Sequence, residues 1–308
     1  MKNKLILTAL GVAGLNVSGP MVRWSLSCGA SPIMISFLRV LISTLVLLGP
    51  ALRSGELQQV LRASKRMLVI ACASAFFLAM NYFCWITSMD CASTFVSTAL
   101  VCTQPLFVMA LSGILLREPI PRRAIPGALV SIAGAVLIGC ASISGGSGSL
   151  KGNVLALTGA AFGAGQWLTS RFARRELPAF GYTTFIYCIT VLILALLIPF
   201  AGGWVVTLPS TGGIVAMSLL CTLGGHALLT YLLGFVGADI VSFALLAEPI
   251  GAAIWAFVLF GETVSPSVLL GGLVIIAGLV LYTWKSMQKT SIAAHFPNRN
   301  PAAGLESK

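Results

Sequence analysis

The chain has 308 residues, of which 57 % are hydrophobic and only 9 % are charged. Soluble domains carry about 25 % charged residues, so this composition leaves too little polar surface to cover a water-soluble globule. It excludes a soluble enzyme, a disordered regulator and a fibrous protein. The net charge of +11 does not indicate a nucleic-acid partner, because the basic residues lie between apolar stretches and not on a soluble surface.

Ten apolar stretches follow one another along the chain, and about 20 apolar residues are enough to cross a hydrocarbon core. Turn and breaker residues separate them, for example Ser31-Pro32 and the Gly/Ser loop 144–149. The first stretch follows Lys2 and Lys4 as a secretory leader would, but we interpret it as the opening of the first helix. The sequence therefore predicts an all-α membrane protein with ten transmembrane helices, over residues 5–24, 33–52, 67–88, 93–115, 124–142, 151–171, 181–201, 211–234, 240–260 and 267–285.

The distribution of Lys and Arg over the short loops predicts the orientation in the membrane. If the N-terminus is cytoplasmic, 16 of the 19 basic residues fall on the inside. Only Arg23 and Lys151 remain outside, and Arg39 lies within the second stretch. We therefore expect a multi-pass protein of the plasma membrane, in a bacterium the inner membrane, with both termini cytoplasmic and with membrane lipid as a partner.

The second half of the chain repeats the first at an offset of 144 residues. Without a gap, this offset gives eleven identities over positions 105–137, among them Glu118 with Glu262 and Gly134 with Gly278. Each half holds five predicted crossings, and because five is odd the second half must enter the membrane inverted. Inverted repeats of this kind build many secondary transporters. We predict two five-helix repeats, residues 1–143 and 144–285, followed by a cytoplasmic, disordered tail, 286–308.

Several of these residues resemble a known family. The run from Pro32 to Arg39, the stretch from Ser93 to Pro105, and the segments Ala247-Glu248-Pro249 and Gly261-Glu262 look like the EamA family. So does the repeated glycine pattern at 127–134 and 271–278. That family belongs to the drug/metabolite transporter superfamily. The resemblance implies ten-helix exporters or exchangers of amino acids and other small metabolites, with a central cavity lined by the first, third, fourth, sixth, eighth and ninth helices.

Ionisable residues inside a membrane are costly and are functional candidates by default. Glu248 lies nine residues past Asp239, which places it about 13 Å deep, near the midplane. Pro249 beside it removes a backbone donor and is expected to kink the helix. Glu248 either binds a proton or substrate, or it stays protonated and hydrogen-bonds a neighbouring helix. His226 shares a polar stripe with Thr222 and Thr230, and it either relays protons or is satisfied by packing.

The other candidates for substrate binding or coupling are neutral polar and aromatic residues on the predicted helices. Either they contact substrate, or the polar ones hold helices together and the tryptophans fill the core. Arg39 lies close enough to the outer end of the second helix to snorkel. It either draws anionic groups or pairs structurally with a carboxylate, and we expect the structural role. With Glu248 and His226, the candidate set comprises Gln104, Asn81, Trp85, Asn16, Gln166 and Trp167.

Several motifs are absent from the sequence. The Gly/Ser loop before Lys151 lacks the phosphate-cradling pattern of an ATPase, and no metal-ligand or Ser/His/Asp set occurs. The eight cysteines form no C-x-x-C pair and are interpreted as small buried hydrophobes. We therefore predict no enzyme activity, no cofactor, no metal and no ATPase subunit. The oligomeric state does not follow from the sequence.

The leading hypothesis is a secondary transporter that exports a small metabolite by alternating access, with proton exchange as an additional expectation. A channel or a non-transporting membrane scaffold is the alternative. A lipid-modifying enzyme would need clustered acids, bases or metal ligands, for which only Glu248 and His226 are present in the membrane.

Overall fold

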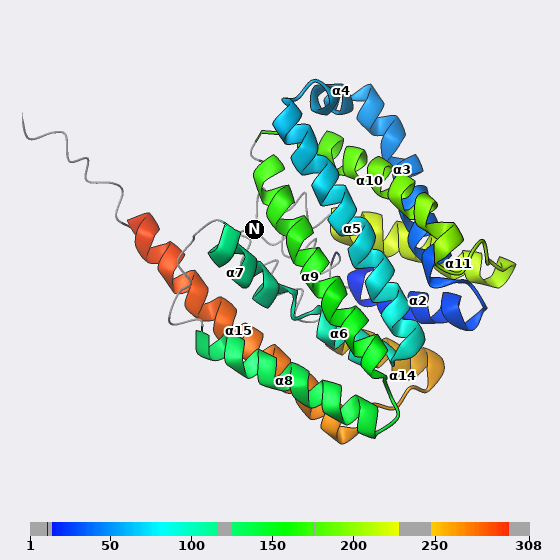
Figure 1. The fold of residues 1–308 in the computed structure, drawn as a ribbon, viewed down its shortest axis with the longest axis vertical. Coiled ribbons are helices and arrows are strands. Elements are labelled where there is room, and N and C mark those ends of the chain that lie inside the picture. The colour runs from blue at the N-terminus through cyan, green and yellow to red at the C-terminus, as the bar shows by residue number, and fades with distance from the viewer. Residues whose placement is uncertain (1–10, 12–13, 116–124, 175, 228–247, 296–308) are drawn as a thin grey trace, which may run out of the picture.

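The structure is a computed structural model that describes residue 11 and residues 14–115, 125–174, 176–227 and 248–295. These residues form helices and no strand, apart from a single bridge between Ala92 and Gly148 (Figure 1). The helices are α2 (Ser18–Ser27), α3 (Pro32–Arg53), α4 (Glu56–Leu61), α5 (Lys65–Cys91), α6 (Thr94–Val101), α7 (Gln104–Leu115), α8 (Ile125–Ser144), α9 (Leu150–Ala173), α10 (Ala179–Leu197), η2 (Ile198–Phe200), α11 (Leu208–Ala216), η3 (Met217–Ala227), α14 (Glu248–Phe260) and α15 (Pro266–His295).

Six helical segments of the described chain are long and apolar enough to cross a membrane, and a shorter apolar one covers Pro266–Tyr282. The six are Pro32–Arg53, Lys65–Cys91, Thr94–Gly113, Ile125–Ser144, Ala179–Phe200 and Leu208–Gly225. The first, fifth, eighth and ninth predicted spans lie partly outside the described residues, and α9 is not among the six although it has 24 residues. The all-α, multi-pass prediction is thus confirmed, whereas the count of ten remains a prediction.

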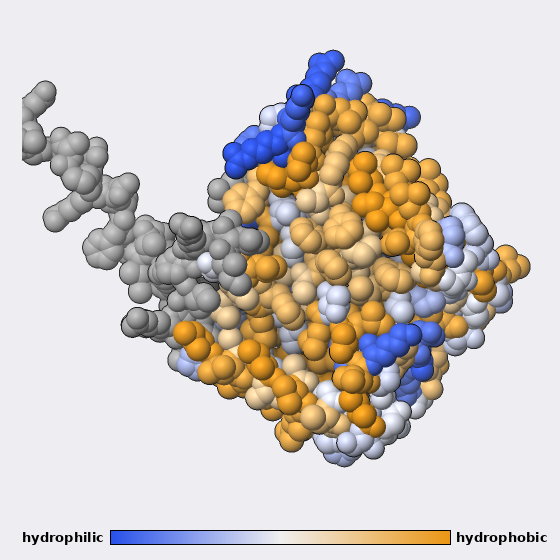
Figure 2. All heavy atoms as spheres, viewed as in Figure 1, coloured by the Kyte–Doolittle hydropathy of each residue, from blue (hydrophilic) through white to orange (hydrophobic). Residues whose placement is uncertain are grey.

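The surface agrees with a membrane environment. Apolar side chains cover the middle of the face in Figure 2, and hydrophilic residues gather where α4 lies and near the ends of α5 and α14. Large apolar residues such as Val69, Leu129 and Leu196 are at least 60 % exposed. An exposed apolar surface of this extent is unusual in soluble monomers and suits contact with lipid.

Helix starts are set by short polar side chains next to the loops. Ser64, Ser93 and Ser149 each accept a hydrogen bond from the backbone nitrogen three residues on, which satisfies one of the free donors of the first turn. At the other end of the chain, α15 continues past Lys285 to His295, into the segment for which the sequence predicts disorder. Residues 296–308 of that segment lie outside the described part.

Helices of the two predicted halves pack directly against one another. In the first half, α5 lies against α9 and α10 of the second, and α3 also contacts α10 (Figure 1). Glycines permit the close approach of α5 and α9, because a Cβ on Gly165 would press on the ring of Phe77. The two halves therefore share one interior instead of forming separate bodies.

The repeated glycines lie where the last helices of the two halves, α8 and α15, cross. A Cβ on Gly127 would overlap the backbone of Gly278 and Tyr282, and one on Gly134 would overlap Gly271 and Ile275. At the offset of 144, Gly127 corresponds to Gly271 and Gly134 to Gly278. The contact of Gly127 with Gly278 and the contact of Gly134 with Gly271 are therefore equivalent, because each joins the first glycine of one copy to the second glycine of the other. A two-fold axis between antiparallel helices produces this pairing. The Ser131 hydroxyl donates to the carbonyl of Ile275, its own equivalent, at 3.2 Å.

This crossing predicts a large difference between two Gly→Ala substitutions. Gly134→Ala forces Cβ into the backbone of α15, and overpacking of this kind costs about 1–3 kcal/mol. Gly49→Ala on α3 is the matched control, because nothing lies within 4 Å of a Cβ there. We expect a lower melting temperature for Gly134→Ala alone, measured in detergent by fluorescence-detected size exclusion. Equal melting temperatures for the two variants would contradict the close α8–α15 contact.

Candidate functional site

The fourth predicted span is interrupted in the middle. The helix α6 ends at Val101, Cys102 and Thr103 form a turn, and α7 begins at Gln104. The Thr103 hydroxyl donates to the carbonyl of Leu100 at 2.6 Å. Pro105 follows Gln104, and because proline has no backbone N–H it is best placed in the first turn of a new helix. The span predicted over 93–115 is thus found as Thr94–Gly113, but it consists of two helices joined by this turn.

The break places Gln104 beside two other helices. Asn81 of α5 donates from Nδ2 to the carbonyl of Gly159 on α9 at 2.8 Å. A Cβ on Gly163, one turn further along α9, would overlap the side chains of both Gln104 and Asn81. We call Asn81, Gln104, Gly159 and Gly163 the central polar cluster. It brings together two of the predicted site residues, Asn81 and Gln104, with two glycines of α9.

The second half has a corresponding helix start. Glu248 corresponds to Gln104 at the offset of 144, and it is the first residue of α14, again followed by proline. Asn16 lies against this helix, because a Cβ on Gly251 would overlap its side chain. The Oδ1 atom of Asn16 is buried and accepts no hydrogen bond. The side chain of Glu248 lies outside the described part, as does that of His226, whose backbone belongs to η3.

Two predicted residues lie apart from the central polar cluster, and Trp85 borders it, because its backbone nitrogen lies 3.3 Å from where a Cβ on Gly159 would be. Gln166 donates to the Ser170 hydroxyl at 3.0 Å and so belongs to a separate network with Tyr182 and Ser74. Trp167 is 38 % exposed on α9. Trp85 is buried and lies next to Arg39, whose guanidinium carbon is 5.6 Å from the centre of the Trp85 ring.

Arg39 does not snorkel to the membrane surface, although it lies close enough to the end of its helix to do so. Its side chain is only 1 % exposed, and Nε donates to the Thr222 hydroxyl at 2.9 Å. Thr222 belongs to η3, an 11-residue π-helix, and helices of this rare type are frequent at functional sites. The interior of the bundle, and not the lipid surface, therefore holds this charge.

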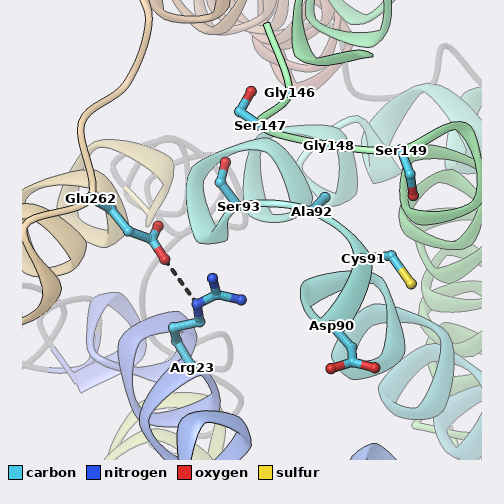
Figure 3. Close-up of a pocket in the computed structure, with 10 residues that line it drawn as sticks. All are labelled: Arg23, Asp90, Cys91, Ala92, Ser93, Gly146, Ser147, Gly148, Ser149 and Glu262. Atoms are coloured by element: carbon cyan, nitrogen blue, oxygen red, sulfur yellow. Dashed lines mark ion pairs between the residues drawn. The ribbon is translucent and has the colours of Figure 1, made fainter.

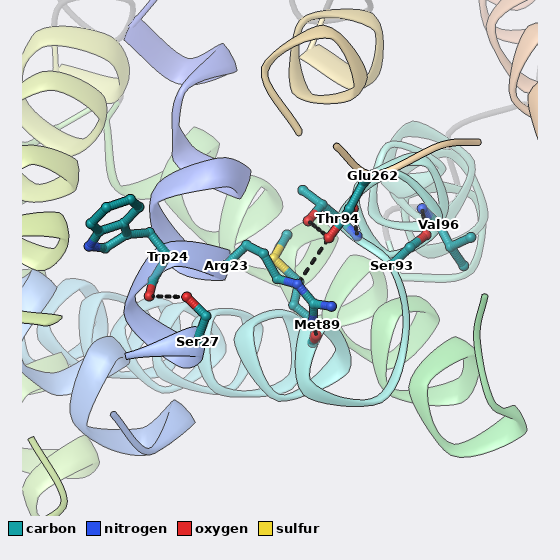
Figure 4. A network of polar contacts seen from close by, with 8 residues as sticks. All are labelled: Arg23, Trp24, Ser27, Met89, Ser93, Thr94, Val96 and Glu262. Atoms are coloured by element: carbon teal, nitrogen blue, oxygen red, sulfur yellow. Dashed lines mark hydrogen bonds and ion pairs between the residues drawn. The ribbon is translucent and has the colours of Figure 1, made fainter. Parts of the chain in front are cut away.

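A second polar site closes one end of the bundle. Arg23 in the middle of α2 forms an ion pair with Glu262, with Nε 2.9 Å from Oε1, and its Nη1 donates to the carbonyl of Met89 at 3.0 Å (Figure 4). The Glu262 carboxylate also accepts from the backbone nitrogen and the hydroxyl of Thr94, at 3.3 and 3.4 Å. We call Arg23, Met89, Thr94 and Glu262 the end latch. It joins the first half to the second.

The end latch borders a pocket of about 330 Å³ (Figure 3). Local sequence features position its members. Gly261 ends α14 with φ 63°, a left-handed conformation that suits glycine, and so turns the chain directly before Glu262. Thr94 opens α6, where a carboxylate is favoured by the free N–H groups and the helix dipole. The pocket lining includes Asp90, Cys91, Ala92, Ser93, the loop 146–149 and both charged members of the latch.

A carboxylate joins the two halves at the opposite end of α5 as well. Glu56, at the start of α4, accepts from the backbone nitrogens of Phe180 and Gly181 at 3.0 and 2.9 Å, and so caps α10. Burial lowers the pKa of Arg174, and the nearby charge of Glu56 opposes this change. Sequence reasoning missed both connections; the only signal was that acidic residues are rare in this chain and stand beside helix starts.

Together, the apolar surface, the membrane-length helices and the two interleaved repeats define a multi-pass helical membrane protein. The EamA-like transporter family model matches residues 3–140 and 150–284, which is most of each half. The chain belongs to this family.

A solved crystal structure with 17 % sequence identity has a similar fold, with a TM-score of 0.65. The similarity covers 94 % of this chain and 99 % of the other. No match was found among curated proteins.

Proposed function

We propose that the protein is a secondary transporter that exports amino acids or related small metabolites by alternating access. The observation that carries this proposal is the break between α6 and α7, which leaves a helix start at Gln104 inside the bundle. Transporters commonly bind substrate near the midplane at interrupted helices, whose free N–H groups and positive dipole end favour anionic groups.

The central polar cluster supplies the neutral part of this site. The carboxamides of Asn81 and Gln104 offer both donors and acceptors between three apolar helices. Gly159 and Gly163 let α9 approach closely, because a Cβ on Gly163 would overlap the two carboxamides and one on Gly159 would press on the α5 backbone. Glu248, at the equivalent helix start of the second half, is proposed as the proton-coupling carboxyl, with His226 and Asn16 as further contacts.

The two ends of the bundle support a mechanism in which the halves move against each other. With both termini in the cytoplasm, the end latch lies on the outer side and the Glu56 cap on the inner side. Each consists of a carboxylate from one half that binds the start of a helix in the other. Opening one end requires breaking its connection while the other end stays closed, which is the requirement for alternating access.

A reconstitution experiment tests this function. Purified protein in liposomes preloaded with an unlabelled amino acid should accumulate the labelled form by counterflow, across a panel of amino acids and related metabolites. Gln104→Ala should lower the rate at least tenfold, or about 1.4 kcal/mol, because it removes a site contact. Gln58→Ala on α4 is the matched control, because this glutamine is exposed. Absence of counterflow for every solute would contradict the proposal, and single-channel conductance would favour the alternative of a channel.

A further inference from the structure

Arg39 is a fully buried cation without an acidic partner among the described residues. Its side chain is 1 % exposed, although it lies on α3 in the second span. The carboxylate of Glu262 pairs with Arg23, and the carboxylate of Glu56 caps α10, so neither faces Arg39. A charge in a region of low dielectric constant needs a counter-charge or several hydrogen-bond partners, and among the described residues Arg39 donates to Thr222.

The guanidinium is held in a fixed orientation. It stacks over the ring of Tyr82, with 4.4 Å from Cζ to the ring centroid, and lies 5.6 Å from the centroid of Trp85. Nε donates to the Thr222 hydroxyl at 2.9 Å, and that hydroxyl in turn donates to the carbonyl of Met217 at 3.5 Å. Rigid placement of this kind reduces the entropy lost when a ligand binds.

Two buried donors, on side chains that contact each other, lack an acceptor. Neither Nη1 of Arg39 nor Nε1 of Trp85 makes a hydrogen bond, and the Trp85 side chain is only 6 % exposed. Buried polar groups are nearly always paired, so an unpaired one needs an explanation. Here both unpaired groups are donors, one is cationic, and they come from neighbouring faces of α3 and α5. What is missing is an anionic acceptor.

We propose that Arg39 and Trp85 bind a carboxylate of the transported solute. A carboxylate has only acceptors, is planar, and matches the fork of a guanidinium. The inference rests on the proposed transport function and adds the substrate class, solutes that carry a carboxylate. Arg39 and Trp85 belong to the first half, whereas Thr222 belongs to the second. The site therefore lies where the halves meet, so their relative motion opens it to the solute and closes it.

The test uses the full chain in liposomes with two probes that differ in one group, L-phenylalanine and L-phenylalaninamide. We expect the solute concentration that gives half-maximal counterflow to be at least tenfold lower for the acid than for the amide. In Arg39→Gln this preference should disappear, and Trp85→Phe, which keeps a ring but loses the N–H donor, should reduce it severalfold. The matched controls are Arg62→Gln and Trp24→Phe, because both residues are exposed.

Three results would overturn the carboxylate site. If the wild-type protein has equal affinity for acid and amide, the proposal that its substrates are recognised by a carboxylate is wrong, whereas the proposed transport function still stands. An Arg39→Gln variant that keeps the full preference for the acid would show that the guanidinium does not bind the carboxylate. Recovery of acid counterflow when Glu248→Gln is added to Arg39→Gln would identify an internal ion pair in place of a ligand contact. Absence of counterflow for all solutes would instead contradict the transport function itself.

Discussion

Glu262→Ala should open, to reagents in solution, the end of the bundle that the end latch closes. The substitution removes the ion pair with Arg23 and the acceptor for Thr94. Loss of a helix cap costs about 1 kcal/mol, and a partly exposed ion pair, here 36 % and 18 %, contributes at most about 1 kcal/mol more. Together they should shift the balance between closed and open states by a factor of about 5–30.

Cys91 provides a native reporter for this opening, because it lines the adjacent pocket and is half-buried. In a variant that retains only this cysteine, Glu262→Ala should increase the rate at which a membrane-impermeant maleimide labels Cys91 by the same factor of about 5–30. Glu262→Gln, whose carbonyl oxygen still accepts from Thr94, should give a smaller increase. Asp90→Asn in the same pocket is the control, since Asp90 is exposed and outside the latch. Unchanged labelling in Glu262→Ala would show that the latch does not hold this end closed.

Glu248→Gln should remove the pH dependence of transport. An isosteric amide keeps the size and hydrogen bonding of the carboxyl but cannot exchange a proton. Counterflow, which needs no net proton movement, should continue, whereas uptake driven by a pH gradient should fall at least tenfold, or about 1.4 kcal/mol. Both rates are measured in the same liposomes, with and without an imposed gradient.

Glu176→Gln is the matched control for this substitution, because Glu176 is an exposed carboxylate just after α9. A Glu248→Gln variant that retains gradient-driven uptake would show that another group carries the proton. Loss of counterflow together with gradient-driven uptake would instead assign Glu248 to substrate binding.

The sequence predicted those features that repeat or that depend on neighbouring residues. Gly127 and Gly134 recur 144 residues later, so the repeat followed from the sequence, and the structure adds that these glycines lie in the contact of α8 with α15. Proline at position 105 was visible as well, yet proline fits either the interior of a kinked helix or the first turn of a new one. The surrounding packing decided between these two, so the break at Gln104 was not predicted.

Contacts between residues far apart in the chain could not be predicted from the sequence. Arg23 and Glu262 are 239 positions apart, and no local rule pairs them. The burial of Arg39 depends on Thr222, Tyr82 and Trp85, which come from two other helices. Depth in the membrane suggested that Arg39 could reach the surface, but depth alone does not determine which side of a helix faces lipid. A single chain also gives no measure of which polar residues are maintained for function.

The exchange of partners between α8 and α15 bears on the ancestry of the chain. Gly127 meets the equivalent of Gly134, and Gly134 meets the equivalent of Gly127, so each surface is complementary to a copy of itself. A gene that encoded one half, and whose product inserted in both directions, would already assemble into an antiparallel homodimer through this seam. Fusion of two such genes then needs no new interface, only a linker and separate divergence of the copies.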